Sequence, residues 1–315
     1  MEKAYGQCTA DDFEFGTECL HLAQTYGGAA KVKLVTGTAD LFKVTHKQDL
    51  FATEQMLRLR ACKVACVTGA SRGIGKEVAR LLCQRGLHVI MIARGLDELT
   101  LAAAEIKGTA VVADMSNPDE VKRVFQTIAE QHGRLDICVN CAGMAANMSI
   151  AGTSDEAWRA VIDGNLSSTF YCCREAMQVM AMASSGSIAV GKGGRGGGGT
   201  RFVGGHDGGS CSASGGIIVN VGSSSVNGGR FGQAAYASSK AGIQTLTETV
   251  ALEGRNAGVL AYCVVPARTN TALRRSLYPD EGGVGCLDPW DVAEVIVSCA
   301  TMANPLLSGQ SFWLK

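Results

Sequence analysis

The stretch that decides the fold runs from Gly215 to Lys240 and reads G-G-I-I-V-N-V-G-S-S-S-V-N-G-G-R-F-G-Q-A-A-Y-A-S-S-K. It predicts a buried strand, a glycine-rich loop that begins near Ser223, and a helix that carries Tyr236 and Lys240. Residues four apart share a face of a helix, so the lysine ammonium should lie beside the phenol and favour the tyrosinate form. The serine hydroxyl could hold a carbonyl oxygen while the phenol protonates it. The three side chains together favour carbonyl reduction, although Y-x-x-x-K is a common spacing and an ordinary helix with an exposed lysine is the alternative.

A second informative segment begins at Lys63, where the apolar run Val64–Val67 is followed by T-G-A-S-R-G-I-G and an amphipathic stretch. A strand, a glycine loop and a helix in this order form the first unit of a dinucleotide-binding sheet, with phosphate at the helix N-terminus. Gly69 permits the turn, Gly73 lets a cofactor approach the backbone, and Gly75 lets the helix close on the sheet. The segment therefore predicts a nucleotide-binding fold.

The end of the next predicted strand indicates which dinucleotide is bound. An acidic residue at this place holds the ribose hydroxyls of NAD, whereas a basic one accommodates the 2′-phosphate of NADP. The strand His88–Ile92 is followed by Ala93 and Arg94, and Arg72 in the glycine loop can approach the same phosphate. Two positions thus favour NADP(H), although either arginine could instead be a solvated surface charge.

From Lys63 to about Gly309, with one interruption, these motifs resemble the short-chain dehydrogenase/reductase family. The resemblance implies one doubly wound α/β Rossmann domain with a parallel sheet, whose active site lies at the carboxyl ends of the strands. Asn140-Cys141-Ala142-Gly143 resembles the N-N-A-G of the family, with cysteine as a mild departure. The resemblance implies that Asn140 and Gly143 hold the adjacent strand and leave room for the cofactor. Asn165 matches the helical asparagine of the family, whose backbone carbonyl holds a water beside the lysine.

The resemblance also assigns site residues. The implied catalytic residues are Ser223, Tyr236, Lys240 and Asn165. The implied cofactor contacts are Gly69, Ser71, Arg72, Gly73, Ile74, Gly75, Arg94, Asp114, Asn140, Ala142, Gly143, Tyr236, Lys240, Pro266 and Thr271. Asp114 could instead begin a turn or cap the helix at Pro118. Ala267 replaces the glycine that follows the proline in the family.

The chain outside these motifs divides into three parts. Residues 1–60 form an N-terminal extension of unknown role, and residues 61–315 form the reductase domain. Residues 184–214 are an insertion rich in Gly and Ser, which is expected to be a disordered loop because it cannot bury enough apolar surface. The insertion is either a lineage-specific loop or an error in the gene model. A continuous helix with an apolar stripe is expected from Ser154 to about Met182.

Composition narrows the range of partners. The 29 Lys and Arg residues balance the 29 Asp and Glu residues, which supplies no electrostatic reason to expect nucleic acid or an anionic membrane. The apolar runs are too short to span a bilayer. The 13 cysteines are odd in number and scattered, which favours reduced core thiols over a disulfide framework. Cytoplasm is the expected compartment, with the mitochondrion as the alternative, although acidic residues near the start argue against a presequence.

Within the family, V-G-S-S-S-V and G-Q-x-x-Y-x-x-S-K most resemble the 3-oxoacyl-(acyl carrier protein) reductases of fatty acid biosynthesis and the mitochondrial-type carbonyl reductase. The resemblance implies NADPH-dependent reduction of a 3-oxoacyl thioester by a homo- or hetero-tetramer, without a metal. Ser214 and Ala257 stand where that group has basic residues for carrier docking. A general carbonyl or quinone reductase therefore remains an alternative, as does a non-catalytic nucleotide-binding subunit.

Overall fold

The computed structural model describes residues 63–185, 215–281 and 283–315. The expectations for the N-terminal extension and for residues 186–214 of the glycine-rich insertion lie outside these residues.

The core of the described chain is a parallel sheet of seven strands in the order β3-β2-β1-β4-β5-β6-β7. The strands are β1 (Val64–Thr68), β2 (His88–Ala93), β3 (Thr109–Val112), β4 (Ile137–Asn140), β5 (Ile217–Val221), β6 (Leu260–Val265) and β7 (Ser311–Trp313). All five residues of β1 are buried, as expected for a central strand covered on both faces. The order changes direction between β1 and β4, and such a switch point is where open α/β sheets bind ligands. The expected doubly wound fold is confirmed.

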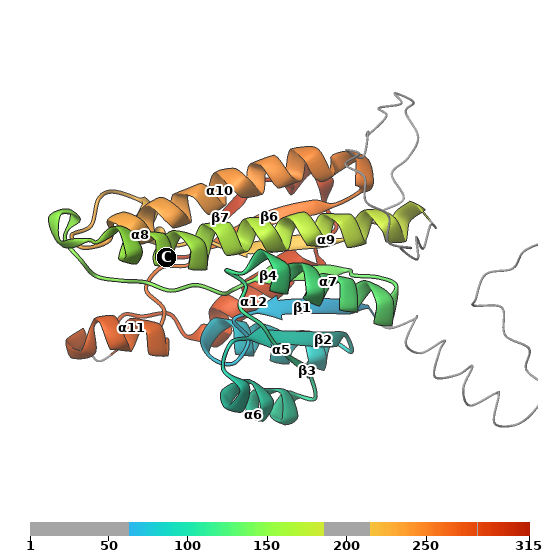
Figure 1. Ribbon diagram of the computed structural model, residues 1–315, viewed down its shortest axis with the longest axis horizontal. Coiled ribbons are helices and arrows are strands. Elements are labelled where there is room, and N and C mark those ends of the chain that lie inside the picture. The colour runs from blue at the N-terminus through green and yellow to red at the C-terminus, as the bar shows by residue number, and fades with distance from the viewer. Residues whose placement is uncertain (1–62, 186–214, 282) are drawn as a thin grey trace, which may run out of the picture. The chain divides into compact units, whose positions relative to one another are not determined.

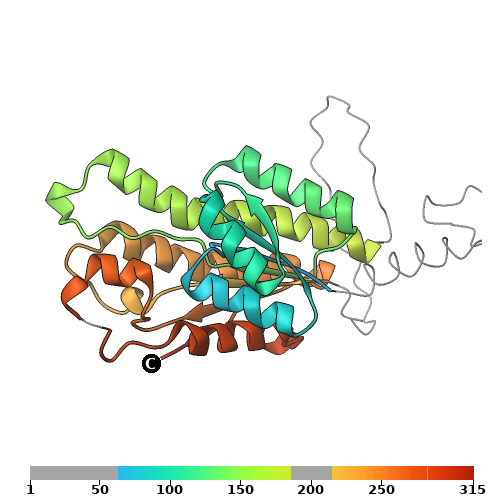
Figure 2. The ribbon, with the colours of Figure 1, turned by 90° about the horizontal axis from the view of Figure 1, so that it is seen from below.

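Helices cover both faces of this sheet (Figures 1 and 2). One apolar cluster packs the sheet against α5 (Gly73–Gln84), α6 (Leu96–Ile106) and α12 (Pro289–Thr301). A second cluster packs the opposite face against α7 (Pro118–His132), α9 (Ser168–Ser185) and α10 (Ala234–Gly254). The shorter helices α8 (Asp155–Ile162) and α11 (Ala272–Leu277) lie toward the same end of the sheet in Figure 1. The core therefore forms two layers, separated by the sheet.

Side-chain caps fix where several of the helices begin. Asn117 Oδ1 accepts from the Asp119 amide at 3.0 Å, and Pro118 occupies the first turn of α7. Asp288 does the same for α12 by accepting from the Trp290 amide at 2.8 Å. Each cap satisfies an amide that has no partner within its own helix.

The expected continuous helix over residues 154–182 differs from the structure. A π-helical segment, Asp163–Ser167, separates α8 from α9 and shifts the phase of the apolar pattern. Val161 is fully buried, but Trp158 and Phe170 are 41% and 44% exposed. The stripe read from the sequence therefore does not lie entirely in the core of this chain.

The cysteines expected in the core are buried there. Cys66, Cys138, Cys172, Cys173, Cys263 and Cys299 are buried free thiols. Burial raises the pKa of the Cys172 and Cys173 thiols, because a thiolate is poorly solvated in an apolar core. Of the described helices, none combines the length and the hydropathy needed to cross a bilayer.

Candidate active site

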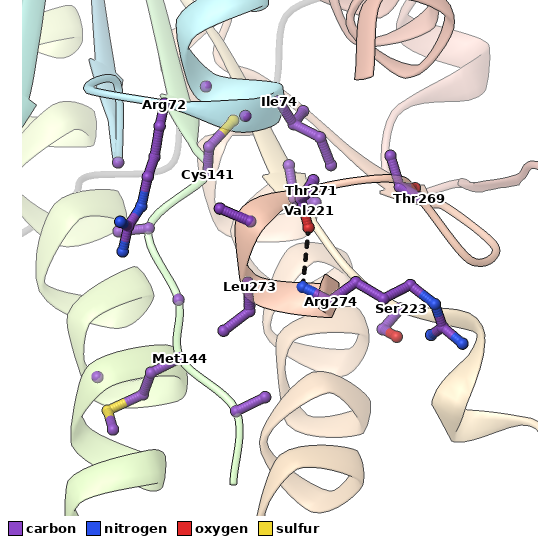
Figure 3. Close-up of a pocket in the computed structure, with 18 of the residues that line it drawn as sticks. Arg72, Ile74, Cys141, Met144, Val221, Ser223, Thr269, Thr271, Leu273 and Arg274 are labelled. Carbon is purple, nitrogen blue, oxygen red and sulfur yellow. Dashed lines mark hydrogen bonds between the residues drawn. The ribbon is translucent and has the colours of Figure 1, made fainter. Parts of the chain in front are cut away.

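A cavity of about 470 Å³ lies at the carboxyl ends of the parallel strands. It is lined by the residues that follow β1, β2, β3, β4, β5 and β6 and by α11. Figure 3 shows Arg72 and Met144 on one side of this space and Ser223 and Arg274 on the other. Of the predicted site residues, Asn140 and Asn165 do not line it. The others do, namely Gly69, Ser71, Arg72, Gly73, Ile74, Gly75, Arg94, Asp114, Ala142, Gly143, Ser223, Tyr236, Lys240, Pro266 and Thr271.

The glycine loop after β1 brings backbone to one wall of the cavity. Gly69 has a φ of +64°, and a Cβ there would lie 2.9 Å from backbone atoms of Ala142. A Cβ on Gly75 would lie 2.4 Å from the Gly69 carbonyl oxygen, so only glycine allows α5 to start this close to the turn. Thr68 Oγ1 accepts from the Ala142 amide at 3.0 Å and joins the ends of β1 and β4. The N-terminus of α5 thus faces the cavity, where its free amides can bind an anion.

Charged side chains surround the end of the cavity beyond β2. Arg72 lies 3.6 Å from the carboxylate of Glu98, and both side chains are largely exposed. Arg94 is exposed as well and has no ion-pair partner among the described residues. Asp114 Oδ1 accepts from the amide and the hydroxyl of Ser116 at 2.9 and 2.8 Å. Asp114 therefore begins a turn, and Asn117 rather than Asp114 caps α7.

Tyr236 and Lys240 lie on α10 at the opposite end of the cavity. Lys240 Nζ donates to the carbonyl of Val221 at 2.8 Å and lies 5.9 Å from the centre of the Tyr236 ring. The lysine is only 5% exposed, and a hydrogen bond from β5 holds its ammonium beside the phenol. Ser223 Oγ accepts from the Ser225 amide at 3.2 Å, which leaves its own proton free to donate. The arrangement can therefore present a hydroxyl and a phenol to one substrate oxygen.

Asn165 lies behind the cavity wall, in the π-helical segment. Its side chain accepts from the Met144 amide at 2.7 Å and donates to the Met144 carbonyl at 2.9 Å. It also donates to Ser239 Oγ at 2.9 Å. Its backbone carbonyl accepts hydrogen bonds from the hydroxyls of Ser168 and Thr169. Asn165 thus positions Met144, which does line the cavity.

Asn140 and Cys141 take different places at the end of β4. Asn140 Nδ2 donates to Asn220 Oδ1 at 2.8 Å, and the two asparagines are register partners in β4 and β5. Its side chain therefore ties two strands together outside the cavity. Cys141 lines the cavity, and burial raises the pKa of its thiol to about 12 although Lys240 acts in the opposite direction. The thiol is protonated at neutral pH.

The far wall of the cavity is formed by the turn after β6 and by α11. Thr271 Oγ1 accepts from the Arg274 amide at 3.2 Å and caps α11, as the dashed line in Figure 3 marks. A Cβ on Gly73 would lie 3.5 Å from the Thr271 methyl group, so the glycine loop and the turn face each other. Gln233 Nε2 donates to the Tyr278 hydroxyl at 2.6 Å and connects the segment after α11 to the start of α10.

Several lining residues lie outside the sequence prediction. The charged and polar ones include Glu98, Ser225, Arg230, Gln233, Arg268, Arg274 and Tyr278. Arg230 lies six residues before Tyr236 in the loop after β5, and this closeness to the predicted catalytic tyrosine is a signal in the sequence. Ser225 and Gln233 lie inside the motifs V-G-S-S-S-V and G-Q-x-x-Y-x-x-S-K, whereas Glu98, Arg268, Arg274 and Tyr278 come from segments without a chemical motif. Two buried polar atoms among them, Ser225 Oγ and Gln233 Oε1, have no hydrogen-bond partner in the described part of the chain.

Comparison with known proteins identifies a family for the chain. Residues 63–192 and 210–282 match the family described as short chain dehydrogenase. Among solved structures, a variant of the actinorhodin polyketide ketoreductase with NADPH superposes with a TM-score of 0.66 at 24% identity, covering 81% of this chain and 96% of that one. That likeness confirms the fold.

Three relatives of similar identity to this chain differ in the substrates that their names give. The 3-oxoacyl-[acyl-carrier-protein] reductase FabG of Vibrio cholerae is 27% identical over 79% of this chain and 94% of its own length. Carbonyl reductase family member 4 of Xenopus tropicalis is 29% identical over 78% and 94%. A 3beta-hydroxysteroid dehydrogenase of Mediterraneibacter gnavus is 33% identical over 67% of each chain. The relatives thus act on carbonyl or hydroxyl carbons, but their names give different substrates.

Proposed function

Since the chain belongs to the short chain dehydrogenase family and is an oxidoreductase acting on CH–OH or C=O groups, we propose that it reduces a carbonyl to an alcohol with NADPH. The observation that carries this proposal is the position of Lys240, whose buried ammonium is held by the Val221 carbonyl beside the Tyr236 ring. A buried lysine in this place stabilises negative charge on the phenol.

The proposed reaction gives each catalytic side chain a defined role. Ser223 donates a hydrogen bond to the carbonyl oxygen and so holds the substrate, without losing its proton. Tyr236 gives a proton to the same oxygen as the alcohol forms. Lys240 stabilises the tyrosinate that remains, and its other ammonium protons can bind ribose hydroxyls. Asn165 is proposed to support the return of a proton to this group from solvent. When bound, the reduced nicotinamide supplies the hydride to the carbonyl carbon.

Several features of the cavity support a phosphorylated dinucleotide as the proposed cofactor. Its glycine turn leaves no room for a Cβ at Gly69 or Gly75, and the N-terminus of α5 faces the same space. The proposed contacts are those predicted from the sequence that line the cavity, with Pro266 and Thr271 at the nicotinamide end. Arg72 and Arg94 would hold the 2′-phosphate, which favours NADP(H) over NAD(H). Asn140 supports this site from the neighbouring strand.

A 3-oxoacyl thioester is the proposed substrate class. The names of two relatives, a FabG and a carbonyl reductase family member, support a carbonyl substrate of this kind. A general carbonyl or quinone reductase is the second candidate, because the hydroxysteroid dehydrogenase matches with higher identity over a shorter stretch. We further propose a tetrameric assembly and a cytoplasmic location, as for bacterial-type reductases of fatty acid biosynthesis.

The test is a comparison of two matched tyrosine variants. Purified protein is mixed with NADPH and either an acetoacetyl thioester or a quinone, and loss of nicotinamide absorbance is followed. Tyr236→Phe should lower kcat by roughly two to four orders of magnitude, because a positioned proton donor contributes that much. Tyr171→Phe removes a phenol on α9 that does not line the cavity, and its rate should match that of the wild type.

The outcomes separate the candidate functions. Full activity in Tyr236→Phe would refute the assigned proton donor. Turnover of the thioester but not of the quinone supports the acyl reductase, and the reverse supports the second candidate. Tight binding of NADPH without turnover of either substrate would instead favour a non-catalytic nucleotide-binding subunit.

A further inference from the structure

We propose that the substrate end of the cavity binds carbonyl compounds that also carry an anionic group, either a carboxylate or a phosphate. This inference rests on the proposed function, because it specifies the substrate class of that same site. It is carried by three arginines that line the cavity near Ser223, together with a buried hydroxyl that has no partner among the described residues.

The three arginines are Arg230, Arg268 and Arg274. An Arg230 nitrogen lies 3.4 Å from the carbonyl of Ser224, the neighbour of Ser223. Arg268 follows the turn at Pro266, whose carbonyl accepts from the Ser224 amide at 3.0 Å. Arg274 lies in the first turn of α11, and Figure 3 shows it on the same side of the cavity as Ser223. All three therefore belong to the end of the cavity that holds the catalytic residues.

The charges at this end are not balanced by acidic lining residues. The carboxylates among the residues that line the cavity are Glu98 and Asp114, and both lie at the opposite end. Arg274 is paired with Glu281 and lies 4.7 Å from the centre of the Tyr278 ring. Arg230 and Arg268 have no carboxylate partner among the described residues. The substrate end thus carries two exposed arginines without a carboxylate partner among the described residues, which favours an anionic ligand.

Ser225 adds a polar group that points to a ligand. Its side chain is 2% exposed, it lines the cavity, and its hydroxyl has no partner among the described residues. A buried hydroxyl without a hydrogen bond is unfavourable, so such atoms in a cavity usually bond to a ligand or to water.

The cofactor phosphates offer a competing explanation for the arginines. Those phosphates have a separate anion site in the glycine loop, at the N-terminus of α5, with Arg72 and Arg94 beyond it. Arg230 and Arg268 come from the loops after β5 and β6 instead. If they bound the cofactor, their loss would raise the KM for NADPH without changing the choice between substrates.

The experiment compares substrates in charged and neutral pairs. The carboxylate pair is 4-carboxybenzaldehyde and its methyl ester, and the phosphate pair is acetoacetyl-phosphopantetheine and acetoacetyl-N-acetylcysteamine. For wild-type protein, kcat/KM should be about tenfold or more higher for the charged member of at least one pair, the size expected for a charged hydrogen bond. The pair that shows the preference identifies the anion, and added salt should reduce the preference.

Two variants and a control assign the preference to these arginines. Arg268→Gln and Arg230→Gln should each lower the charged-to-neutral ratio by about fivefold to tenfold, with an unchanged KM for NADPH. Arg275→Gln is the control, because Arg275 lies on the same helix α11 as Arg274 but bonds to Asn270 and does not line the cavity. Its ratio should equal that of the wild type.

Several results would overturn the inference. Equal kcat/KM values within both pairs would refute it while leaving the proposed carbonyl reduction intact. An unchanged ratio in both arginine variants, or a change confined to the KM for NADPH, would also refute it. If the wild-type protein reduced none of the four compounds, both the inference and the proposed function would fail together.

Discussion

The preference for NADPH over NADH gives the most quantitative prediction, because it depends on three exposed charged residues, Arg72, Arg94 and Glu98. Arg72 and Glu98 form an ion pair at 3.6 Å, with side-chain exposures of 66% and 60%. An exposed pair of this kind contributes about 0 to 1 kcal/mol, so a bound 2′-phosphate can take Arg72 from Glu98 at little cost. Arg94 has no carboxylate to release among the described residues.

The expected effect follows from the contacts that a phosphate would gain. A hydrogen bond to a charged group contributes about 1.5 to 3 kcal/mol, and solvent screening at this exposed place favours the lower end of that range. Arg94→Ala should therefore lower the ratio of kcat/KM for NADPH to that for NADH by roughly tenfold, and the Arg72→Ala/Arg94→Ala double variant by roughly a hundredfold. Glu98→Gln should raise the ratio by about twofold to fivefold, because it frees Arg72 and removes a like charge from the phosphate.

The assay measures initial rates with both cofactors at low and high salt. Arg123→Ala is the control, since Arg123 is an exposed residue of α7 that pairs weakly with Glu120 and does not line the cavity. A wild-type preference for NADH, or a double variant whose ratio stays within about twofold of the wild type, would contradict the reasoning.

Two further predictions concern packing and pH. Gly75→Ala should lower the free energy of unfolding by about 1 to 3 kcal/mol and weaken NADPH binding, because its Cβ would meet the Gly69 carbonyl at 2.4 Å. Gly229→Ala, where a Cβ meets open space, should change neither, and equal thermal melts and fluorescence titrations for the two variants would refute this reading. Burial, with a smaller contribution from His88, lowers the pKa of His132 in the folded protein, so stability should fall as pH drops below the ordinary histidine range near 6.5. Melting temperatures measured between about pH 7.5 and 5.5 test this, because that range spans the ordinary pKa of histidine. If the melting temperature of His132→Gln fell equally steeply over the same range, His132 would be excluded as the cause.

The sequence was sufficient to predict the sheet and one face of the site, because these parts depend on local patterns. The run Val64–Val67 and the glycines after it predicted β1, the turn and α5. A buried strand requires apolar residues and a tight turn requires glycine, so both can be recognised from residue type. Ser223 and Tyr236 were assigned to one site from their spacing together with the family resemblance, and both line the cavity because β5 and α10 are joined by a single loop.

The parts that sequence reasoning missed depend on contacts between distant segments. The π-helical segment forms where the buried Asn165 bonds both backbone atoms of Met144, and helical periodicity carries no sign of that contact. Arg268 and Arg274 lack a motif, and they line the same cavity as Ser223 only because the loop after β6 and helix α11 pack over the carboxyl ends of the strands. Asn140, by contrast, makes the bond to the adjacent strand that the family resemblance implied for it, although it does not line the cavity.

The double hydrogen bond between Asn165 and Met144 has a mechanical consequence for the reductase. An amide side chain that binds both the N–H and the C=O of one residue acts like a single rung of a sheet ladder. The chain leaving β4 cannot slide by one residue without breaking both bonds together. Through Ser239, the same amide also bonds to helix α10, which carries Tyr236. Displacement of the cavity wall around Met144 is therefore coupled to displacement of the Tyr236 phenol. Any opening and closing of the cavity should instead involve movement of the opposite wall, at α11.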